Sequence, residues 1–204
     1  MPDPCRPLPR VEEPVRVGAR FPIVGIGASA GGLEALDQFL RHVPERIGMA
    51  FVVVQHLDPT RKGVLASLLQ RATTMVVVQV KDRTKVRPDC VYVIPPGKDM
   101  SILQGVLHLH APAESRGLRL SVDIFLRSLA EDSHDLAIGV ILSGMGSDRT
   151  LGLAAIKESA GVVFVQEPGS AKYDGMPRSA IEAGLADFVS PRRTCRKDRR
   201  LFPP

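Results

Sequence analysis

Short apolar runs alternate with segments of helical periodicity through most of this 204-residue chain, and this alternation limits the folds open to it. The run Ala50–Gln55 is a continuous apolar stretch rich in valine, which is typical of a strand buried on both faces. Strands that are repeatedly followed by amphipathic helices indicate βαβ units. We therefore predict an α/β fold of three layers, in which a doubly wound, mainly parallel sheet lies between helices.

The same patterns give the individual elements. Strands are predicted at 22–26, 50–55, 76–80, 91–94, 138–142, 162–166 and 188–189, and helices at 33–43, 64–72, 122–130, 151–159 and 176–183. One part departs from the alternation. After Pro95-Pro96-Gly97, two apolar runs at 100–103 and 106–109 are joined around Gln104-Gly105, which predicts an antiparallel hairpin.

The composition divides the chain into one folded unit and two flanking segments. With 44% hydrophobic residues, the chain is long enough for one domain, which we assign to residues 21–191. Residues 1–20 are rich in proline and are expected to be disordered. Residues 192–204 hold six cationic residues and one aspartate, which accounts for the whole net charge of +5. We expect a disordered basic tail on a balanced domain, without specific nucleic-acid recognition.

Cysteine usage and hydropathy indicate the compartment. The three cysteines are scattered and have neither disulfide-like nor zinc-like spacing, which indicates a reduced, cytoplasmic setting. The longest apolar run, at 49–54, is far shorter than the roughly 20 residues that span a bilayer, so no membrane insertion is expected. We expect a monomer without a metal or other cofactor. His108 and His110 alternate on the predicted hairpin and are interpreted as surface residues, because no further metal ligand is close in sequence.

Ser29 stands in a Gly-x-Ser-x-Gly pattern between the first strand and the first helix. Gly27 and Gly31 leave room for a sharp turn and for a substrate carbonyl near the serine hydroxyl, so Ser29 is a candidate nucleophile. The start of the following helix supplies free N–H groups for an oxyanion. Candidate donors are the amides of Ala30 and Gly31, together with Met145 in the Gly144-Met145-Gly146 turn.

Three predicted strands lead to residues of complementary chemistry. The first is followed by Ser29, the second by His56, and the strand at 138–142 by a glycine-rich turn and Asp148. The carboxyl ends of parallel strands lie along one edge of a sheet, so these side chains are expected to meet there. His56 would accept the proton of Ser29, and Asp148 would orient the imidazole and stabilise its charged form. A loop at 173–177 is expected to line the same cleft.

Other interpretations of these residues stay open. Gly25-x-Gly27-x-x-Ala30 fits a relaxed dinucleotide-binding fingerprint, although an acidic residue does not close the second strand. Asp148 before a helix could serve only as an N-cap. An ordinary α/β-hydrolase is disfavoured, because a single strand precedes Ser29 and the order of the three residues differs.

Several motifs taken together resemble the catalytic domain of the chemotaxis protein-glutamate methylesterases, the CheB family, especially the form fused to a receptor methyltransferase. The matching segments are Val-Gly-Ile-Gly-Ala-Ser-Ala-Gly-Gly from Val24, Val-Val-Gln-His-Leu-Asp-Pro from Val53, Tyr-Val-Ile-Pro-Pro from Tyr92, Leu-Ser-Gly-Met-Gly-Ser-Asp from Leu142 and Asp-Gly-Met-Pro from Asp174. Carried over by position, the resemblance implies the same catalytic set, Ser29, His56 and Asp148.

The resemblance also implies an activity and a partner. Members of the family hydrolyse glutamate methyl esters on the cytoplasmic helices of chemoreceptors, release methanol without a cofactor, and often deamidate receptor glutamines. A shallow crevice is expected for such a substrate. Arg149 stands where the family usually has glycine, and neither a receiver domain nor a methyltransferase is recognised in this sequence. A second hypothesis is therefore a catalytically impaired, receptor-binding remnant of a larger chemotaxis fusion protein.

Overall fold

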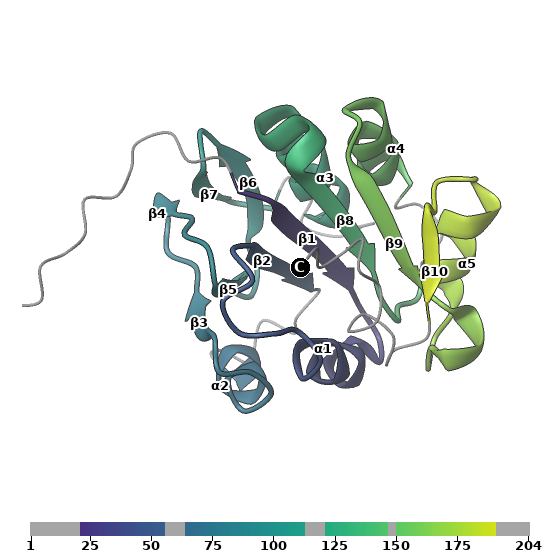
Figure 1. The fold of residues 1–204 in the computed structure, drawn as a ribbon, viewed down its shortest axis with the longest axis horizontal. Helices are drawn as coiled ribbons and strands as arrows, with labels where there is room; N and C mark the ends of the chain where they lie inside the picture. Colours follow the sequence, from purple (N-terminus) through teal and green to yellow (C-terminus); the bar gives the residue numbers. More distant parts are fainter. Residues whose placement is uncertain (1–20, 56–63, 113–120, 147–149, 191–204) are drawn as a thin grey trace, which may run out of the picture.

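A parallel sheet forms the centre of the molecule (Figure 1). The computed structural model describes residues 21–55, 64–112, 121–146 and 150–190. Within these residues the sheet has seven strands in the order β10-β9-β8-β1-β2-β5-β3, and every neighbouring pair is parallel. Its strands are β1 (Ile23–Ala28), β2 (Ala50–Gln55), β3 (Val76–Gln79), β5 (Cys90–Val93), β8 (Ala137–Ile141), β9 (Val162–Gln166) and β10 (Phe188–Ser190).

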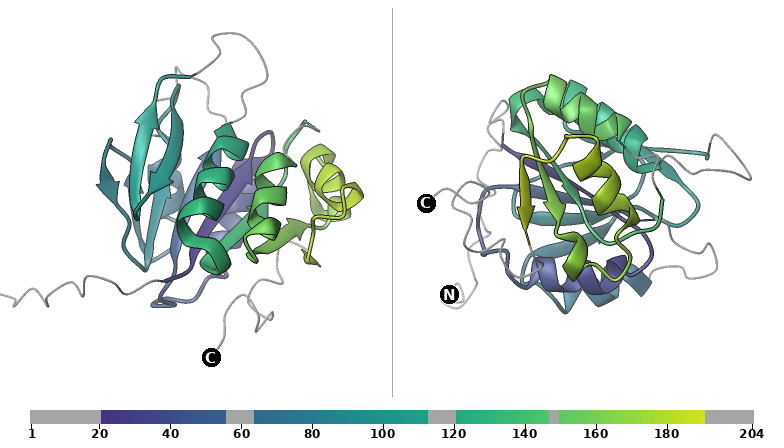
Figure 2. Two further views of the ribbon diagram at one scale, coloured as in Figure 1. Left: turned by 90° about the horizontal axis from the view of Figure 1, so that it is seen from above. Right: turned by 90° about the vertical axis from the view of Figure 1, so that its right-hand side faces the viewer.

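Helices cover both faces of this sheet, as Figure 2 shows in its right-hand view. One face carries α1 (Gly32–Leu40) and α2 (Val64–Gln70), and the other carries α3 (Ser121–Ser133), α4 (Leu151–Glu158) and α5 (Gly175–Glu182). Short 3-10 helices occupy His134–Leu136 and Pro168–Ser170. The predicted three-layer, doubly wound α/β fold is confirmed. Among the described helices, none combines the length and the apolar character needed to cross a membrane.

The alternation of side chains along the central strands divides the core in two. Val24 and Ile26 of β1 face α1 and α2, where they pack with Phe39. Val52 and Val54 of β2 face the opposite way and pack with the apolar side of α3. Because both faces are covered, valine is needed at successive positions, which explains the continuous apolar runs in the sequence.

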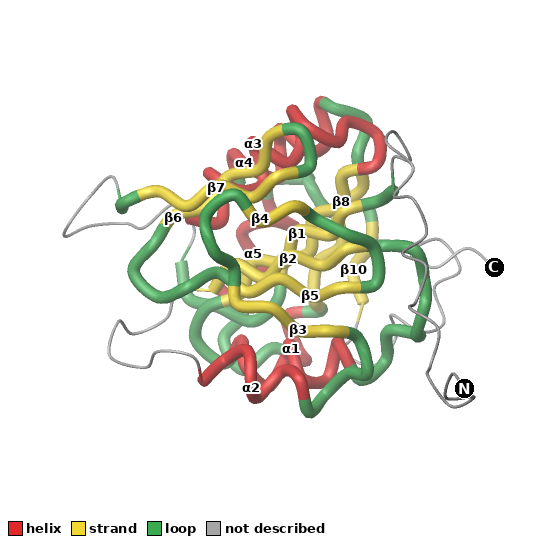
Figure 3. Tube along the Cα trace, turned by 90° about the vertical axis from the view of Figure 1, so that its left-hand side faces the viewer, coloured by secondary structure: helices red, strands yellow, loops and turns green. Residues whose placement is uncertain are grey.

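A small antiparallel sheet adjoins the main one (Figure 3). It consists of β4 (Thr84–Lys85), β6 (Asp99–Leu103) and β7 (Val106–His110), in the order β4-β7-β6. The predicted hairpin is confirmed: Gln104 and Gly105 connect β6 and β7 with φ angles of 51° and 68°, as a tight hairpin turn requires. The strand β4 was not predicted from the sequence, because it is only two residues long.

Two glycines of β1 allow α3 to pack directly against the strand. A Cβ atom on Gly25 would lie 2.8 Å from Leu126 Cδ2, and one on Gly27 would lie 2.6 Å from Val122 Cγ1. Both distances are shorter than ordinary carbon contacts, so only glycine fits at this helix spacing. The glycines inside β1 therefore have a packing role that is separate from the turn after the strand.

We expect Gly27→Ala to lower the free energy of unfolding by about 1–3 kcal/mol, because the added methyl group overpacks a closed core. Val122 cannot yield easily, since a β-branched side chain has little χ1 freedom. Urea unfolding of both proteins measures the difference. Gly169→Ala is the matched control: a Cβ there meets no atom within 4 Å, and we expect a change within about 0.5 kcal/mol. Equal effects of the two substitutions would contradict the packing argument.

Candidate active site

Ser29 lies in the turn that links β1 to α1. The Gly32 N–H donates to the Ser29 carbonyl at 2.8 Å, which closes a four-residue turn. Gly31, the third residue of the turn, has φ 70° and ψ 0°, whereas Ala30 is not among the residues with positive φ. These angles define a type II turn, which favours glycine at its third position. The conformational need for Gly31 is therefore confirmed, and the half-buried Ser29 stands beside the start of α1.

The chain that follows β8 packs against this turn. The Ser29 N–H donates to the Ser143 carbonyl at 3.1 Å, and the Ser143 hydroxyl lies 3.0 Å from the Ala30 carbonyl oxygen. A Cβ on Gly144 would approach the Cβ of Ser29 to 3.0 Å and would collide with Met176. The glycine-rich turn after β8 thus lies in direct contact with the serine, as its sequence suggested.

The loop before α5 completes this part of the site. Gly144 N–H donates to the Tyr173 carbonyl at 3.0 Å, and Met176 N–H donates to the Gly144 carbonyl at the same distance. A Cβ on Gly31 would lie 3.2 Å from Tyr173 Cδ2. The loop at 173–177 therefore borders the Ser29 turn, and its role as the lining of a substrate cleft stays a prediction. Tyr173 and Met145 remain 39% and 59% exposed, so a partner molecule can reach both.

The amide groups proposed as oxyanion donors have no competing role within the described residues. There, no hydrogen bond engages the N–H of Ala30, Gly31 or Met145. All three belong to the two turns that meet at Ser29. Unengaged N–H groups next to a nucleophile are the feature that an oxyanion hole requires. The assignment of these residues stays a prediction.

His56 and Asp148 lie outside the described residues. The strands that precede them in the sequence are nevertheless well defined. β1 lies between β2 and β8, with Ala28 paired to Gln55 and Gly27 paired to Ile141. The residues that follow Ala28 and Gln55 in the chain are Ser29 and His56. The three strands that lead to the proposed catalytic residues are thus adjacent at the centre of the sheet.

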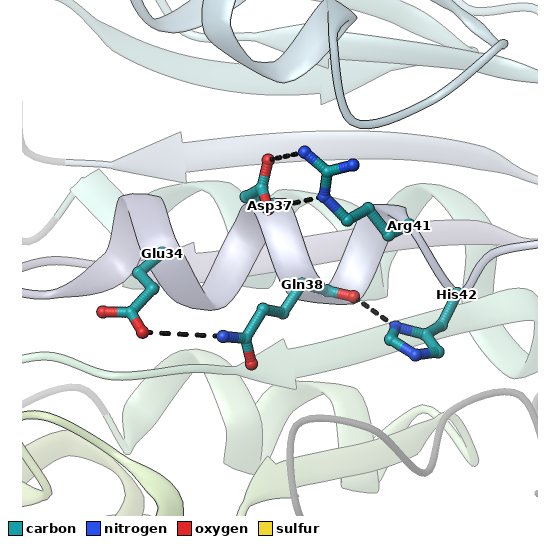
Figure 4. Close-up of polar contacts among 5 residues, drawn as sticks. All are labelled: Glu34, Asp37, Gln38, Arg41 and His42. Carbon is teal, nitrogen blue, oxygen red and sulfur yellow. Dashed lines mark hydrogen bonds and ion pairs between the residues drawn. The ribbon is translucent and has the colours of Figure 1, made fainter.

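The four other histidines of the chain have different surroundings. His42 follows α1, and its Nδ1 lies 2.6 Å from the Gln38 carbonyl at the end of the helix distant from Ser29 (Figure 4). His134 comes at the end of α3. His108 and His110 belong to β7 in the small sheet, where His110 Nε2 contacts Ser101 Oγ at 2.7 Å. In the described ranges, no three His, Cys, Asp or Glu side chains gather as metal ligands would.

Polar side chains stabilise the exposed side of α1. Asp37 and Arg41 form an ion pair one turn apart, with Nε and Oδ2 2.7 Å from each other, and Gln38 Nε2 lies 3.5 Å from Glu34 Oε1 (Figure 4). Such pairs support a short helix in water. The side chains on this face of α1 therefore have structural partners.

The geometry disfavours the dinucleotide interpretation. Gly25 and Gly27 lie inside β1 and face α3, whereas a pyrophosphate needs its glycines in the loop after the strand. A hollow beside Gly146, lined by residues of β8, α4 and α5, is too narrow to hold even a water molecule. It is smaller than the roughly 300–1,000 Å³ of usual small-molecule sites. A substrate presented at the surface fits these dimensions better than a bound dinucleotide does.

Asp174 and Arg178 form an ion pair beside Tyr173. The Arg178 guanidinium donates to Asp174 at 2.6 Å, and this hydrogen bond is the largest of the contributions that lower the pKa of the carboxyl group. Both groups are exposed, so water screens the interaction. The pair therefore adds no net charge to this part of the surface.

Polar side chains for which the sequence predicted no role support the turns; Ser143 and Gln166 are buried and Gln55 is half-buried. The Gln55 side chain donates from Nε2 to the Ser29 carbonyl at 3.2 Å, and Gln166 Oε1 accepts the Ser143 N–H at 2.8 Å. Ser143 is fully buried, and sequence reasoning treated it only as part of a glycine-rich turn. The feature of the sequence that could have revealed these residues is a polar side chain that ends or follows an otherwise apolar strand.

Comparisons with known proteins agree with this geometry. A model of the CheB methylesterase family matches residues 24–197. A protein-glutamate methylesterase/protein-glutamine glutaminase from Moorella thermoacetica is 36% identical over 174 residues, which are 83% of this chain and 41% of that protein. The protein-glutamate methylesterase FrzG from Myxococcus xanthus is 34% identical over 187 residues, which are 91% of this chain and 56% of that protein. This chain thus spans about half the length of these relatives.

A solved structure shares the fold. The crystal structure of the Thermotoga maritima CheB methylesterase catalytic domain superimposes with a TM-score of 0.81 at 32% sequence identity. The match covers 89% of this chain and 97% of that domain. The likeness therefore extends over nearly the whole of a catalytic domain.

We expect Gly31→Ala to reduce the free energy of unfolding by about 2–4 kcal/mol, because it combines a left-handed backbone with a close contact. A Cβ on Gly31 would lie 2.8 Å from Ser143 Oγ. Gly97→Ala separates the two causes: Gly97 has the same φ of 70°, but nothing lies within 4 Å of a Cβ there, so we expect only about 1–2 kcal/mol. Chemical denaturation of the two variants measures both free energies of unfolding. A smaller loss of stability for Gly31→Ala than for Gly97→Ala would refute the claim that the close contact adds to the cost.

Proposed function

The chain belongs to the CheB methylesterase family, and from this membership and the geometry around Ser29 we propose that it is a protein-glutamate methylesterase acting on chemoreceptors. The observation that carries the proposal is the position of Ser29. The serine follows the central strand, in a type II turn whose Ala30 and Gly31 N–H groups have no hydrogen-bond partner among the described residues and lie beside the glycine-rich turn after β8. This is the arrangement that presents a nucleophile together with oxyanion donors.

The proposed reaction is acyl transfer through Ser29. The Ser29 hydroxyl attacks the carbonyl carbon of a glutamate methyl ester, and His56 accepts its proton. Asp148 stabilises the imidazolium, and the amides of Ala30, Gly31 and Met145 receive the oxyanion. When the tetrahedral intermediate collapses, the C–O bond to the methyl group's oxygen breaks, and His56 protonates the departing methoxide to give methanol.

Water completes the cycle. It attacks the acyl ester on Ser29 while His56 removes its proton, and the proton then returns to Ser29 as the glutamate carboxylate leaves. The same route on a glutamine side chain releases ammonia instead of methanol. A relative's name includes protein-glutamine glutaminase, and we propose deamidation as a second reaction of this site.

The proposed substrate is a side chain on the cytoplasmic helices of a methyl-accepting receptor. Such a glutamate ester projects from a helical surface, so the enzyme needs an open edge with exposed apolar contacts. Met145 and Tyr173 provide contacts of that kind beside Ser29. This substrate places the enzyme in the cytoplasm.

We expect Ser29→Ala to reduce methanol release from a methylated receptor fragment at least about 10³-fold, because removal of the nucleophile of a serine hydrolase can cost about 10⁶-fold in kcat. Ser101→Ala is the matched control. Ser101 contacts a histidine, His110, but it lies in the small sheet, and we expect unchanged methanol release. Methanol release that survives in Ser29→Ala would refute the proposal, whereas receptor binding by the wild type without methanol release would favour the impaired remnant.

A further inference from the structure

A half-buried side chain, Gln55, and a buried one, Ser143, hold the peptide groups that follow Ser29, one on each side of the turn. Gln55 approaches from β2, and Ser143 approaches from the end of β8. Neither residue belongs to the proposed catalytic set. We propose that Gln55 and Ser143 are positioning residues, which fix the Ala30 and Gly31 amides in the direction needed to stabilise the oxyanion. The inference rests on the proposed serine mechanism and adds a specific means of preorganisation to it.

Gln55 fixes the peptide group between Ser29 and Ala30. The Ser29 carbonyl accepts from Gly32 N–H at 2.8 Å and from Gln55 Nε2 at 3.2 Å. The facing atom is a carbonyl oxygen, so the amide of Gln55 must turn its nitrogen toward it. Gly32 makes room for that amide, because a Cβ there would lie 3.3 Å from Gln55 Nε2. In a trans peptide the C=O and the next N–H point in opposite directions, so the Ala30 N–H points away from Gln55.

Ser143 fixes the next peptide group in the same way. Its hydroxyl accepts the Tyr173 N–H at 3.0 Å and has two carbonyl oxygens within reach of its proton, that of Ala30 at 3.0 Å and that of Tyr173 at 3.2 Å, of which Ala30 is the nearer. The accepted bond occupies one side of the hydroxyl and leaves its single proton for a carbonyl. With the Ala30 carbonyl held toward Ser143, the Gly31 N–H points away from Ser143. The two donors are thus oriented by hydrogen bonds made on the opposite sides of their peptide groups.

We call Gln55 and Ser143 the clamp residues. Holding the peptide groups in advance matters because reorienting them during the reaction would cost free energy. In a type II turn the central peptide can flip toward the type I arrangement, which would exchange the positions of the Ala30 carbonyl and the Gly31 N–H. An oxyanion hole is effective because its donors are already oriented before charge develops. Ser143 opposes this flip in the resting enzyme, and Gln55 holds the neighbouring Ser29–Ala30 peptide group in place. The loss of either residue should therefore affect the chemical step more than substrate binding.

The test uses Gln55→Met and Ser143→Ala with p-nitrophenyl acetate, a small activated ester that needs no receptor. We expect kcat to fall about 10–100-fold in each variant, below the roughly 10²–10³-fold effect of deleting an oxyanion donor outright. KM should change less than about twofold, because the clamp does not touch the substrate. Gln55→Glu keeps the shape of the side chain without the donor, and it should lose activity to a similar extent if Gln55→Met fails to fold.

Matched controls separate positioning from stability. Gln70 ties the end of α2 to Met75 through Nε2 at 3.0 Å, and Ser128 accepts Ile102 N–H and donates to the Phe125 carbonyl. Both resemble the clamp residues in their bonding but lie away from the Ser29 turn. Gln70→Met and Ser128→Ala should lower the urea midpoint as much as the clamp variants do, with kcat unchanged.

The outcomes distinguish this inference from the proposed function. Normal kcat in Gln55→Met and Ser143→Ala, or equal losses of kcat in the controls, would overturn the inference alone. Nitrophenol release that depends on Ser29 and on the clamp, without methanol release from methylated receptors, would support the inference and refute the assigned substrate. Ester hydrolysis that does not depend on Ser29 would overturn both.

Discussion

The parallel pairing of β8, β1 and β2 is the constraint on which the proposed site depends. Parallel strands end at the same edge, so their pairing brings together loops that are far apart in the sequence. Ala28 pairs with Gln55, and Ser29 N–H bonds to the Ser143 carbonyl. A change of register in either pair would separate the Ser29 turn from its supports. The sheet therefore acts as the rigid frame of the site, and the loops at its edge carry the chemistry.

Glycines near Ser29 meet two different physical needs. Gly27 faces α3 and allows the helix to approach β1, whereas Gly31 adopts a left-handed conformation that closes the turn. Gly144 lets the turn after β8 pack against Ser29 and Met176. A Gly-x-Ser-x-Gly pattern is thus only partly a feature of the nucleophile, because its first glycine belongs to the core. This division also explains why the dinucleotide fingerprint matched the sequence without a matching loop.

Much of the fold could be predicted because the core consists of strongly patterned segments. The valine-rich run of β2 needs burial on both faces, and Gln104-Gly105 favours a tight hairpin. The strand β4 could not be predicted, since two residues carry no periodicity. Ser29 and its neighbours were found from local turn chemistry. The roles of Gln55 and Ser143 could not be found in this way, because their hydrogen bonds join segments that become neighbours only through the order of the strands in the sheet. His56 and Asp148 stay predictions outside the described residues.

The central claim is that Ser29 becomes covalently modified during the reaction. The most direct measurement is peptide mapping by mass spectrometry after incubation with a fluorophosphonate, which captures an activated serine hydroxyl. We expect one phosphonyl group on the peptide that contains Ser29 and none on the peptide that contains Ser101. Modification of a different serine, or an unmodified Ser29 in a protein that still releases methanol, would contradict the account.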